Sequence, residues 1–218
     1  MTVLMKSKER IGEAEFLQNY DITKYDRPSY TADVLAVKEN QILLIQRGNH
    51  PYKDYWALVG GFVEMSEDIV EAAKRELQEE TGLTALNLAE LATYGTPGRD
   101  PRGRIISTVY IAQVQGQVLA DDDAKNAQWF DITMGDEDDI LTIQLSYESE
   151  ILRIVAKIEQ NPLSGKRFCA TLFESDLAFD HGRIVADGLL ALRRWNDGET
   201  KFNIGERLLS TNNGERLF

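Results

Sequence analysis

The stretch that decides the fold of this chain is GGFVEMSEDIVEAAKRELQEETGL, which runs from Gly60 to Leu83. It holds seven carboxylates against two basic side chains, and Glu76, Glu79 and Glu80 stand within five positions of one another. Like charges at that spacing repel each other on a helix. The stretch is therefore either a solvated acidic helix face or a site for a strongly positive ligand.

Local signals place a helix in the second half of this stretch. Ser66 is a typical N-cap residue and Gly82 a typical C-terminal stop, so we expect the helix to run from about Glu67 to Thr81. At about 100° per residue, its three glutamates share one arc. The neighbouring arc is apolar and suits packing in the core, with Ile69, Val70, Ala73 and Leu77. The acids thus border the buried stripe, and three carboxylates on one rigid element suit a hard cation such as Mg²⁺.

The spacing of the stretch resembles the signature of the Nudix hydrolases. From Gly61 the chain reads Gly, five residues, Glu67, seven residues, Arg75-Glu76-Leu77, one residue, Glu79-Glu80, one residue, Gly82-Leu83. The resemblance implies an α/β fold, namely an α/β/α sandwich with a mixed sheet. It also implies hydrolysis of a nucleoside diphosphate linked to another moiety, with Mg²⁺ or Mn²⁺ as cofactor.

The same resemblance assigns roles to residues of the stretch. Glu76, Glu79 and Glu80 would be metal ligands, and Gly61 would add its backbone carbonyl. Arg75 would orient the glutamates and belongs with them to the catalytic set. Metal ions offset the charge of a pyrophosphate and lower the pKa of a bound water, so these roles are chemically coherent.

Two supporting roles and the general base complete this assignment. Glu67 and Gly82 would support the loop–helix geometry. The base varies within the family, so three sources stay open. They are a motif glutamate, the DDD run at 121–123 and the GDEDD run at 135–139.

Outside the signature, the chain resembles the Nudix branch of ADP-ribose pyrophosphatases and of regulators of NAD metabolism. The segments that carry this likeness are YDRPSYTADV, LLIQRGNHPYKDYWALVGGFVE, TYGTPGRDPRGRIISTVYIA, AQWF and LAFDHGRIVADGL. Pro97 follows Leu83 by 14 positions, as is frequent in ADP-ribose pyrophosphatases, whereas Val59 stands where the branch usually has proline. The likeness implies hydrolysis of ADP-ribose to AMP and ribose 5-phosphate.

Arginines supply the candidate substrate contacts. Guanidinium groups bind phosphate in a bidentate manner, so we expect Arg47, Arg99 and Arg104 to bind the substrate. Three aromatic residues are candidates for stacking on adenine, although core packing is favoured for each: Trp56, Phe62 and Tyr94.

Two other functions stay open. One is a Nudix enzyme for another substrate, such as NADH, a dinucleoside polyphosphate or a damaged nucleotide. The other is a non-catalytic, ADP-ribose-sensing transcriptional regulator. Such regulators carry a winged helix after the Nudix domain, and only 23 residues follow Trp195. The signature is also intact, so an enzyme is favoured.

The composition limits partners and compartment. A net charge of −12 argues against nucleic-acid binding through bulk electrostatics. Cys169 is the single cysteine, which excludes an internal disulfide and fits a cytoplasmic protein. The chain shows neither a signal peptide nor an apolar run of membrane-spanning length. We expect a nucleotide as partner, no membrane, and a homodimer by resemblance to the family.

The remaining pattern suggests the domain organisation. We expect residues 1–27 to hold a helix over 8–20 and a lead-in, residues 28–195 to form the Nudix domain, and 196–218 to be a polar tail. The strands are expected at Ala32–Val37, Gln41–Gln46, Leu88–Thr93, Ile105–Gln113 and Gln128–Phe130.

Two further helices are expected towards the C-terminal end. SYESEILRIVAKIEQN has apolar residues at helical spacing, which predicts a helix within a helical insertion at about 135–175. FDHGRIVADGLLALRRW predicts an amphipathic helix from about Asp180 to Trp195. His181 stands at its start, where a cap or packing role is favoured over a catalytic one.

Overall fold

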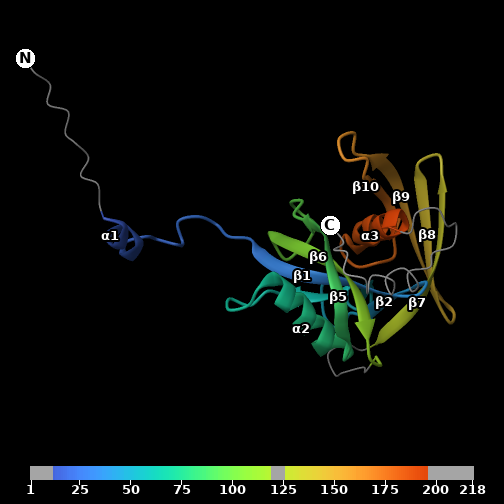
Figure 1. Cartoon of the computed structure of the whole chain (residues 1–218), viewed down its shortest axis with the longest axis horizontal. Coiled ribbons are helices and arrows are strands. Elements are labelled where there is room, and N and C mark those ends of the chain that lie inside the picture. The colour runs from blue at the N-terminus through green and yellow to red at the C-terminus, as the bar shows by residue number, and fades with distance from the viewer. Residues whose placement is uncertain (1–11, 119–125, 196–218) are drawn as a thin grey trace, which may run out of the picture.

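The computed structural model describes residues 12–118 and 126–195, and it consists of one large sheet with helices (Figure 1). In chain order the elements are α1 (Glu13–Gln18), β1 (Ser29–Lys38), β2 (Gln41–Gln46), β3 (Trp56–Ala57), β4 (Val59–Phe62), α2 (Ile69–Thr81), β5 (Thr84–Tyr94), β6 (Ile105–Gln115), β7 (Ala127–Glu137), β8 (Ile140–Tyr147), β9 (Glu150–Gln160), β10 (Arg167–Ser175) and α3 (His181–Trp195).

The sheet is mixed, as expected. Its strands follow the order β10-β9-β8-β7-β2-β1-β6-β5, while β3 pairs with β2 and β4 with β1. The pair β1 and β6 is parallel, and the other pairs are antiparallel. β1 lies centrally and is buried on both faces, because its alternate side chains enter two separate cores.

The two cores lie under two helices on opposite faces of the sheet. On one face α2 buries Ala72, Ala73 and Leu77 against side chains such as Val34 of β1. On the other face α3 packs so closely on β1 that a side chain at Gly188 would collide with Leu35. This arrangement confirms the expected α/β/α sandwich and the C-terminal helix.

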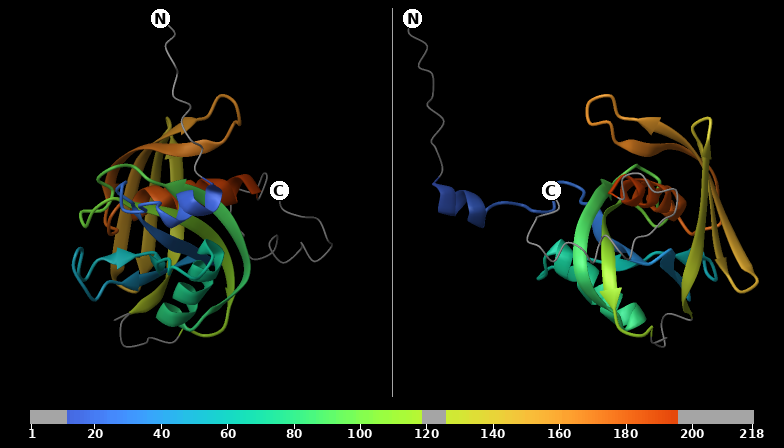
Figure 2. Two further views of the ribbon diagram at one scale, coloured as in Figure 1. Left: turned by 90° about the vertical axis from the view of Figure 1, so that its left-hand side faces the viewer. Right: turned by 45° about the vertical axis from the view of Figure 1, so that its right-hand side comes forward.

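The predicted helical insertion at about 135–175 is wrong. The segment forms β8, β9, β10 and the end of β7, and Figure 2 shows these long strands curving around α3. In β9 the buried residues recur at every second position: Leu152, Ile154, Ala156 and Ile158. The sequence ILRIVAKI satisfies both a helical and a strand period, and pairing with β8 and β10 selects the strand.

Tight turns connect these strands. The GDEDD run at 135–139 is not a loop, because its first three residues belong to β7. Asp138 and Asp139 form the turn to β8, with φ values of 50° and 61°. Glu148, with φ of 51°, lies in the turn from β8 to β9. Positive φ at such positions is typical of two-residue hairpins.

The ends of the helices differ slightly from prediction. Asp68 is the N-cap of α2 instead of Ser66, because its carboxylate accepts a hydrogen bond from Val70 N at 3.3 Å. Gly82 ends α2 in the left-handed conformation, with φ of 71°, as expected. Of the helix expected over 8–20, residues 8–11 lie outside the described part of the chain; α1 ends at Gln18 and not at residue 20, buries no residue and extends away from the sheet in Figure 1.

Several expectations fall outside the described residues, namely those on 1–11, the acidic run at 121–123 and the tail at 196–218. The proposed domain bounds of 28 and 195 stay a prediction. In the parts of the chain that the structure describes, no helix has the length and apolar character needed to cross a membrane.

Candidate active site

The signature segment places its glutamates against a glycine backbone. β4 pairs with β1 so that Gly60 lies opposite Asp33. Gly60 has φ of 153°, and a side chain there would collide with the Asp33 carboxylate. A side chain at Gly61 would collide with the Glu76 carboxylate. Both glycines are therefore needed, because only bare backbone lets α2 and β1 bring their carboxylates this close.

Arg75 connects the glutamates of the segment to one another. Its Nε and Nη2 donate to the two oxygens of Glu67 at 3.1 and 2.7 Å. Its Nη1 donates to Glu76 at 2.7 Å and to Glu79 at 3.0 Å, and Nη2 also reaches the carbonyl of Phe62. Hydrogen bonds to Glu67 raise the pKa of Arg75 above its usual range. The expected orienting role of Arg75 thus has a geometric basis.

Glu80 is the most enclosed carboxylate of the segment. Its Oε2 accepts a hydrogen bond from Gly60 N at 3.0 Å. Burial, reinforced by the charges of Glu76 and Asp33, raises the pKa of Glu80 to about 8. Burial also raises the pKa of Glu76, although Arg75 opposes this effect. Glu76 and Glu80 thus both have raised pKa values and both approach the Gly60–Gly61 backbone, and such a pair of acids favours the binding of a positive ligand.

Asp33 is a site residue that the sequence analysis missed. It lies in the apolar strand TADVLAV, is only 7% exposed, and accepts a hydrogen bond from the Ser107 hydroxyl of β6. Its charge contributes to the raised pKa of Glu80. A buried acid within an otherwise apolar strand was the available signal, because burying a carboxylate is costly without a partner.

His181 also lies at this site, at the first residue of α3. Its Nδ1 accepts a hydrogen bond from Leu58 N at 2.9 Å, so the neutral ring carries its proton on Nε2. Burial lowers the pKa of the His181 imidazole, which keeps the ring neutral at pH 7. The ring packs on Phe179 and lines the same cavity as Asp33.

A cavity of about 110 Å³ lies beside the two glycines. Arginines and aromatic rings surround it. The Arg47 guanidinium lies 4.7 Å from the ring centre of Phe179. Arg102 lies 5.2 Å from the ring of Phe62 and 5.4 Å from that of Phe179. Burial, followed by the charge of Arg102, lowers the pKa of Arg47. The cavity therefore combines cationic and flat apolar surfaces, which suit a phosphate group and a ring.

The three predicted substrate-binding arginines have different surroundings in the structure. Arg47 and Arg99 line the cavity. The Arg99 guanidinium, however, makes two hydrogen bonds to Asp180, at 2.9 and 2.7 Å, and its side chain is only 6% exposed. Arg104 is exposed and does not line the cavity. Arg102, an arginine of the same loop that was not among the three preferred ones, lies beside the rings and pairs with Asp100 at 2.7 Å.

The three aromatic residues considered for stacking on adenine also have different surroundings. Phe62 lines the cavity beside Arg102. Trp56 packs against Phe130 in the core, with ring centres 4.9 Å apart. Tyr94 donates a hydrogen bond to Asp187 at 2.8 Å on the α3 side of the sheet. Core packing therefore accounts for Trp56 and Tyr94, and only Phe62 is placed to meet a ligand.

The fit of the acidic cluster to a divalent cation is partial. In residues 12–118 and 126–195, no three His, Cys, Asp or Glu side chains are arranged to hold a metal ion. Glu76 and Glu79 accept from the same Arg75 nitrogen, so a cation that contacts Glu76, Glu79 and Glu80 together requires a change of rotamer. The donor set itself consists of hard carboxylate oxygens, which Mg²⁺ and Mn²⁺ prefer.

The acidic run at 135–139 lies away from this cluster. Asp136 pairs with Arg167 at 2.5 Å and with Arg193 at 3.5 Å. None of its residues lines the cavity beside the glycines. The described geometry thus leaves the motif glutamates as the nearer candidates for a general base.

Comparison with known proteins identifies the family. The NUDIX domain model matches residues 27–142. An ADP-ribose pyrophosphatase of Methanocaldococcus jannaschii is 44% identical over 122 residues, covering 54% of this chain and 72% of that protein. The ADPR responsive transcriptional repressor NtrR of Acinetobacter baylyi is 41% identical over 109 residues, covering 47% of this chain and 44% of the repressor.

A solved structure is similar over most of the chain. The crystal structure of a MutT/nudix family protein from Enterococcus faecalis has 30% identity and a TM-score of 0.67, and the match covers 89% of this chain and 73% of that one. Coverage this wide extends beyond the 116 residues of the domain match, so the likeness continues past residue 142. Together with the intact signature and its folded geometry, these matches show that the chain belongs to the Nudix family and is a Nudix hydrolase.

Proposed function

We propose that this Nudix hydrolase cleaves ADP-ribose to AMP and ribose 5-phosphate with Mg²⁺ or Mn²⁺. One observation carries the proposal. Glu76 and Glu80, whose pKa values are raised by burial, meet the Gly60–Gly61 backbone beside a cavity lined by arginines and aromatic rings. The 44% identity to an ADP-ribose pyrophosphatase supports the choice of substrate.

The glutamates and Gly61 are the residues that would hold the cation. Glu76, Glu79 and Glu80 supply carboxylates, and Gly61 supplies its carbonyl. When bound, a divalent cation offsets the charge on the pyrophosphate oxygens and acidifies the attacking water. Arg75 fixes Glu76 and Glu79 through its shared Nη1, which keeps two of these carboxylates close together.

The cavity residues would bind the organic and phosphate parts of the substrate. Arg47 and Arg102 are placed to contact the diphosphate, and Phe62 and Phe179 are placed to contact a flat ring. In this proposal Arg99 positions rather than binds, because its side chain is only 6% exposed and pairs with Asp180. Arg102 also pairs with a carboxylate, that of Asp100, but 39% of its side chain is exposed. A contact between substrate and Arg104 stays a prediction.

A substrate panel tests the proposal. Purified protein with Mg²⁺ or Mn²⁺ is given ADP-ribose, NADH, diadenosine polyphosphates, sugar nucleotides or oxidised nucleoside triphosphates, and products are separated by chromatography. We expect ADP-ribose to have the highest kcat/KM and to yield AMP and ribose 5-phosphate. Equal or better turnover of another substrate would refute the choice of ADP-ribose. Unchanged activity in EDTA would refute the metal requirement.

A transcriptional regulator is the second candidate, because the chain is 41% identical to part of a repressor. It predicts retardation of promoter DNA in gels, released by ADP-ribose. The net charge of −12 works against DNA affinity. Absence of a retarded band at micromolar protein, together with ADP-ribose turnover, would exclude this candidate.

We also propose a cytoplasmic homodimer. The proposal rests on the resemblance to the family. Sedimentation equilibrium of the full chain tests the dimer, and a mass of about 25 kDa at micromolar concentration would contradict it, because one chain has 24.7 kDa.

A further inference from the structure

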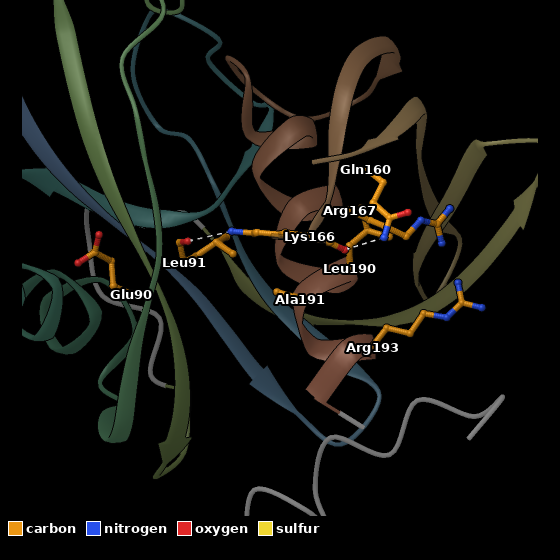
Figure 3. A pocket seen from close by; sticks show the side chains of 9 residues that line it. Glu90, Leu91, Gln160, Lys166, Arg167, Leu190, Ala191 and Arg193 are labelled. Carbon is orange, nitrogen blue, oxygen red and sulfur yellow. Dashed lines mark hydrogen bonds between the residues drawn. The ribbon is translucent and has the colours of Figure 1, made fainter. Parts of the chain in front are cut away.

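A second cavity lies where β5, the β9–β10 hairpin and the last turns of α3 meet (Figure 3). Its volume is about 430 Å³, and it shares no lining residue with the candidate active site. Three separate parts of the chain form it. β5 contributes Leu91, the hairpin contributes Lys166 and Arg167, and α3 contributes Leu190, Ala191 and Arg193.

The lining is rich in positive charge, although the chain as a whole is acidic. Arg167 and Arg193 share one carboxylate oxygen, Oδ2 of Asp136, at 2.5 and 3.5 Å. Within residues 12–118 and 126–195, one other carboxylate approaches Arg167, that of Asp139, at 4.0 Å, and it is 74% exposed. Two guanidinium groups offer ten N–H donors between them, and the described carboxylates occupy few of these donors.

Lys166 adds a third cation. It belongs to the β9–β10 loop, and its ammonium group donates to the backbone carbonyl of Leu91 at 3.4 Å, away from the two guanidinium groups (Figure 3). In the described residues no carboxylate forms an ion pair with it. Among the described residues of the lining, Glu90 is the only acid, and Figure 3 shows its carboxylate on the opposite side of the cavity from the two guanidinium groups.

The rest of the lining is apolar. Leu91 and Leu190 are 8% and 6% exposed, and Ala191 is half-buried beside them. The volume falls within the range of about 300–1,000 Å³ that is usual for small-molecule sites. Guanidinium and ammonium groups bind phosphate strongly, and a phosphomonoester carries nearly two negative charges at pH 7. The cavity thus matches a small ligand with a phosphate at one end and an apolar part at the other.

We propose that this cavity is a second binding site, which takes a phosphomonoester. The phosphate contacts Arg167 and Arg193, whose guanidinium groups meet at Asp136, and the remainder of the ligand lies on Leu190 and extends towards Leu91 and the Lys166 ammonium. The site does not depend on the proposed ADP-ribose activity. It also requires no divalent cation, because the chain itself supplies the positive charge.

Calorimetric titration of the full chain tests the site. Inorganic phosphate, ribose 5-phosphate and AMP are titrated separately, in Mg²⁺ and in EDTA, at low and high salt. We expect saturable binding of one ligand per chain that persists in EDTA and weakens with salt. Arg167→Gln and Arg193→Gln should each weaken binding about tenfold, because each removes a charge-assisted contact. Both variants should leave turnover of the Nudix substrate unchanged.

Lys157→Gln is the matched control. Lys157 is an exposed lysine of β9 that pairs with Glu159, so its loss changes net charge equally without touching the cavity. Circular dichroism checks that each variant is folded. Equal affinity for phosphate and AMP would indicate a site for the phosphate group alone, and tighter AMP binding would indicate use of the apolar surface; either supports the proposal. Binding that needs Mg²⁺, that Lys157→Gln weakens equally, or that none of the three probes shows would overturn it.

Discussion

The two faces of the sheet carry clusters of opposite charge. Beneath α2, burial raises the pKa of Glu80 to about 8, and the Gly60 N–H is the hydrogen-bond donor to this carboxylate. Near the end of α3, Arg167 donates to Asp136 and lowers the pKa of that carboxyl. The comparison shows that burial raises the pKa of one carboxyl while a paired guanidinium lowers the pKa of another, whatever the net charge of the chain. One cluster therefore favours a cation and the other an anion.

The largest expected effect comes from neutralising the acidic cluster. Glu80→Gln keeps the shape of the side chain but removes its negative charge, so we expect kcat on ADP-ribose to fall by about a hundredfold or more. Glu71→Gln is the control, because Glu71 lies on the same helix, is exposed and pairs with Lys74. Wild-type kcat in Glu80→Gln would show that the buried carboxylate has no part in the reaction.

The close approach beneath α2 provides the second prediction. Gly61→Ala places a methyl group against the Glu76 carboxylate, so we expect a loss of about 1–3 kcal/mol in the free energy of unfolding and a fall in kcat of about tenfold or more. Gly135→Ala is the control, since a Cβ there meets nothing within 4 Å. Urea unfolding and steady-state kinetics measure both effects. Equal behaviour of the two alanine variants would refute the close-approach argument.

The α2 segment and the β8–β10 segment also differ in how far their structure could be predicted. The helix of α2, its glycine stop and the contacts of Arg75 lie within about twenty residues, so local pattern contained most of the information. β9 was misread because ILRIVAKI fits two periods, and its neighbours in the sheet decide between them. The positive φ of Asp138 and Glu148 marks the hairpins that the pattern analysis missed.

Within the candidate active site, too, local patterns could be predicted from the sequence and contacts between distant segments could not. Arg99 was expected to contact the substrate because it lies in a loop rich in arginine. Its guanidinium instead donates hydrogen bonds to Asp180, which stands 81 positions later. Asp33 was overlooked because its importance arises only when β4 and α2 fold against β1. Contacts between distant segments cannot be read from local spacing, and both residues owe their surroundings to such contacts.

Binding of Mg²⁺ should raise the thermal stability of the chain through the acidic cluster beneath α2 and not through the cationic cavity near α3. We expect Mg²⁺ at about a hundredfold excess over its Kd to stabilise the chain by about 2–3 kcal/mol, which corresponds to a rise in Tm of about 5–10 °C. Glu80→Gln should abolish most of this rise, because the cation then loses a carboxylate ligand. Lys166→Gln should leave it intact. Thermal unfolding in EDTA and in Mg²⁺ measures the difference, and an equal rise in all three proteins would contradict a site beneath α2.

The smallest expected effect concerns His181, where α3 reaches the active site from the other face. Burial lowers the pKa of the imidazole, and the charges of Arg99 and Arg47 act in the same direction. Asp33 and Asp180 oppose this effect. The ring is therefore neutral in the folded chain at a pH where the unfolded chain binds a proton. Stability contributed by His181 is fully present above the unfolded pKa of about 6.5 and decreases as pH falls below it.

Urea unfolding at pH values of about 7.5 and 5.5 tests this sign. Between these values we expect the wild type to lose about 1 kcal/mol more than His181→Gln, because the variant has no imidazole to protonate when it unfolds. His50→Gln is the control, since His50 is the other histidine of the chain and is exposed. The comparison must be between slopes, because the carboxylates contribute the same pH dependence to all three proteins. A slope in His181→Gln as steep as in His50→Gln would mean that the folded chain binds the proton at His181, and the neutral ring at the junction of α3 and the active site would be refuted.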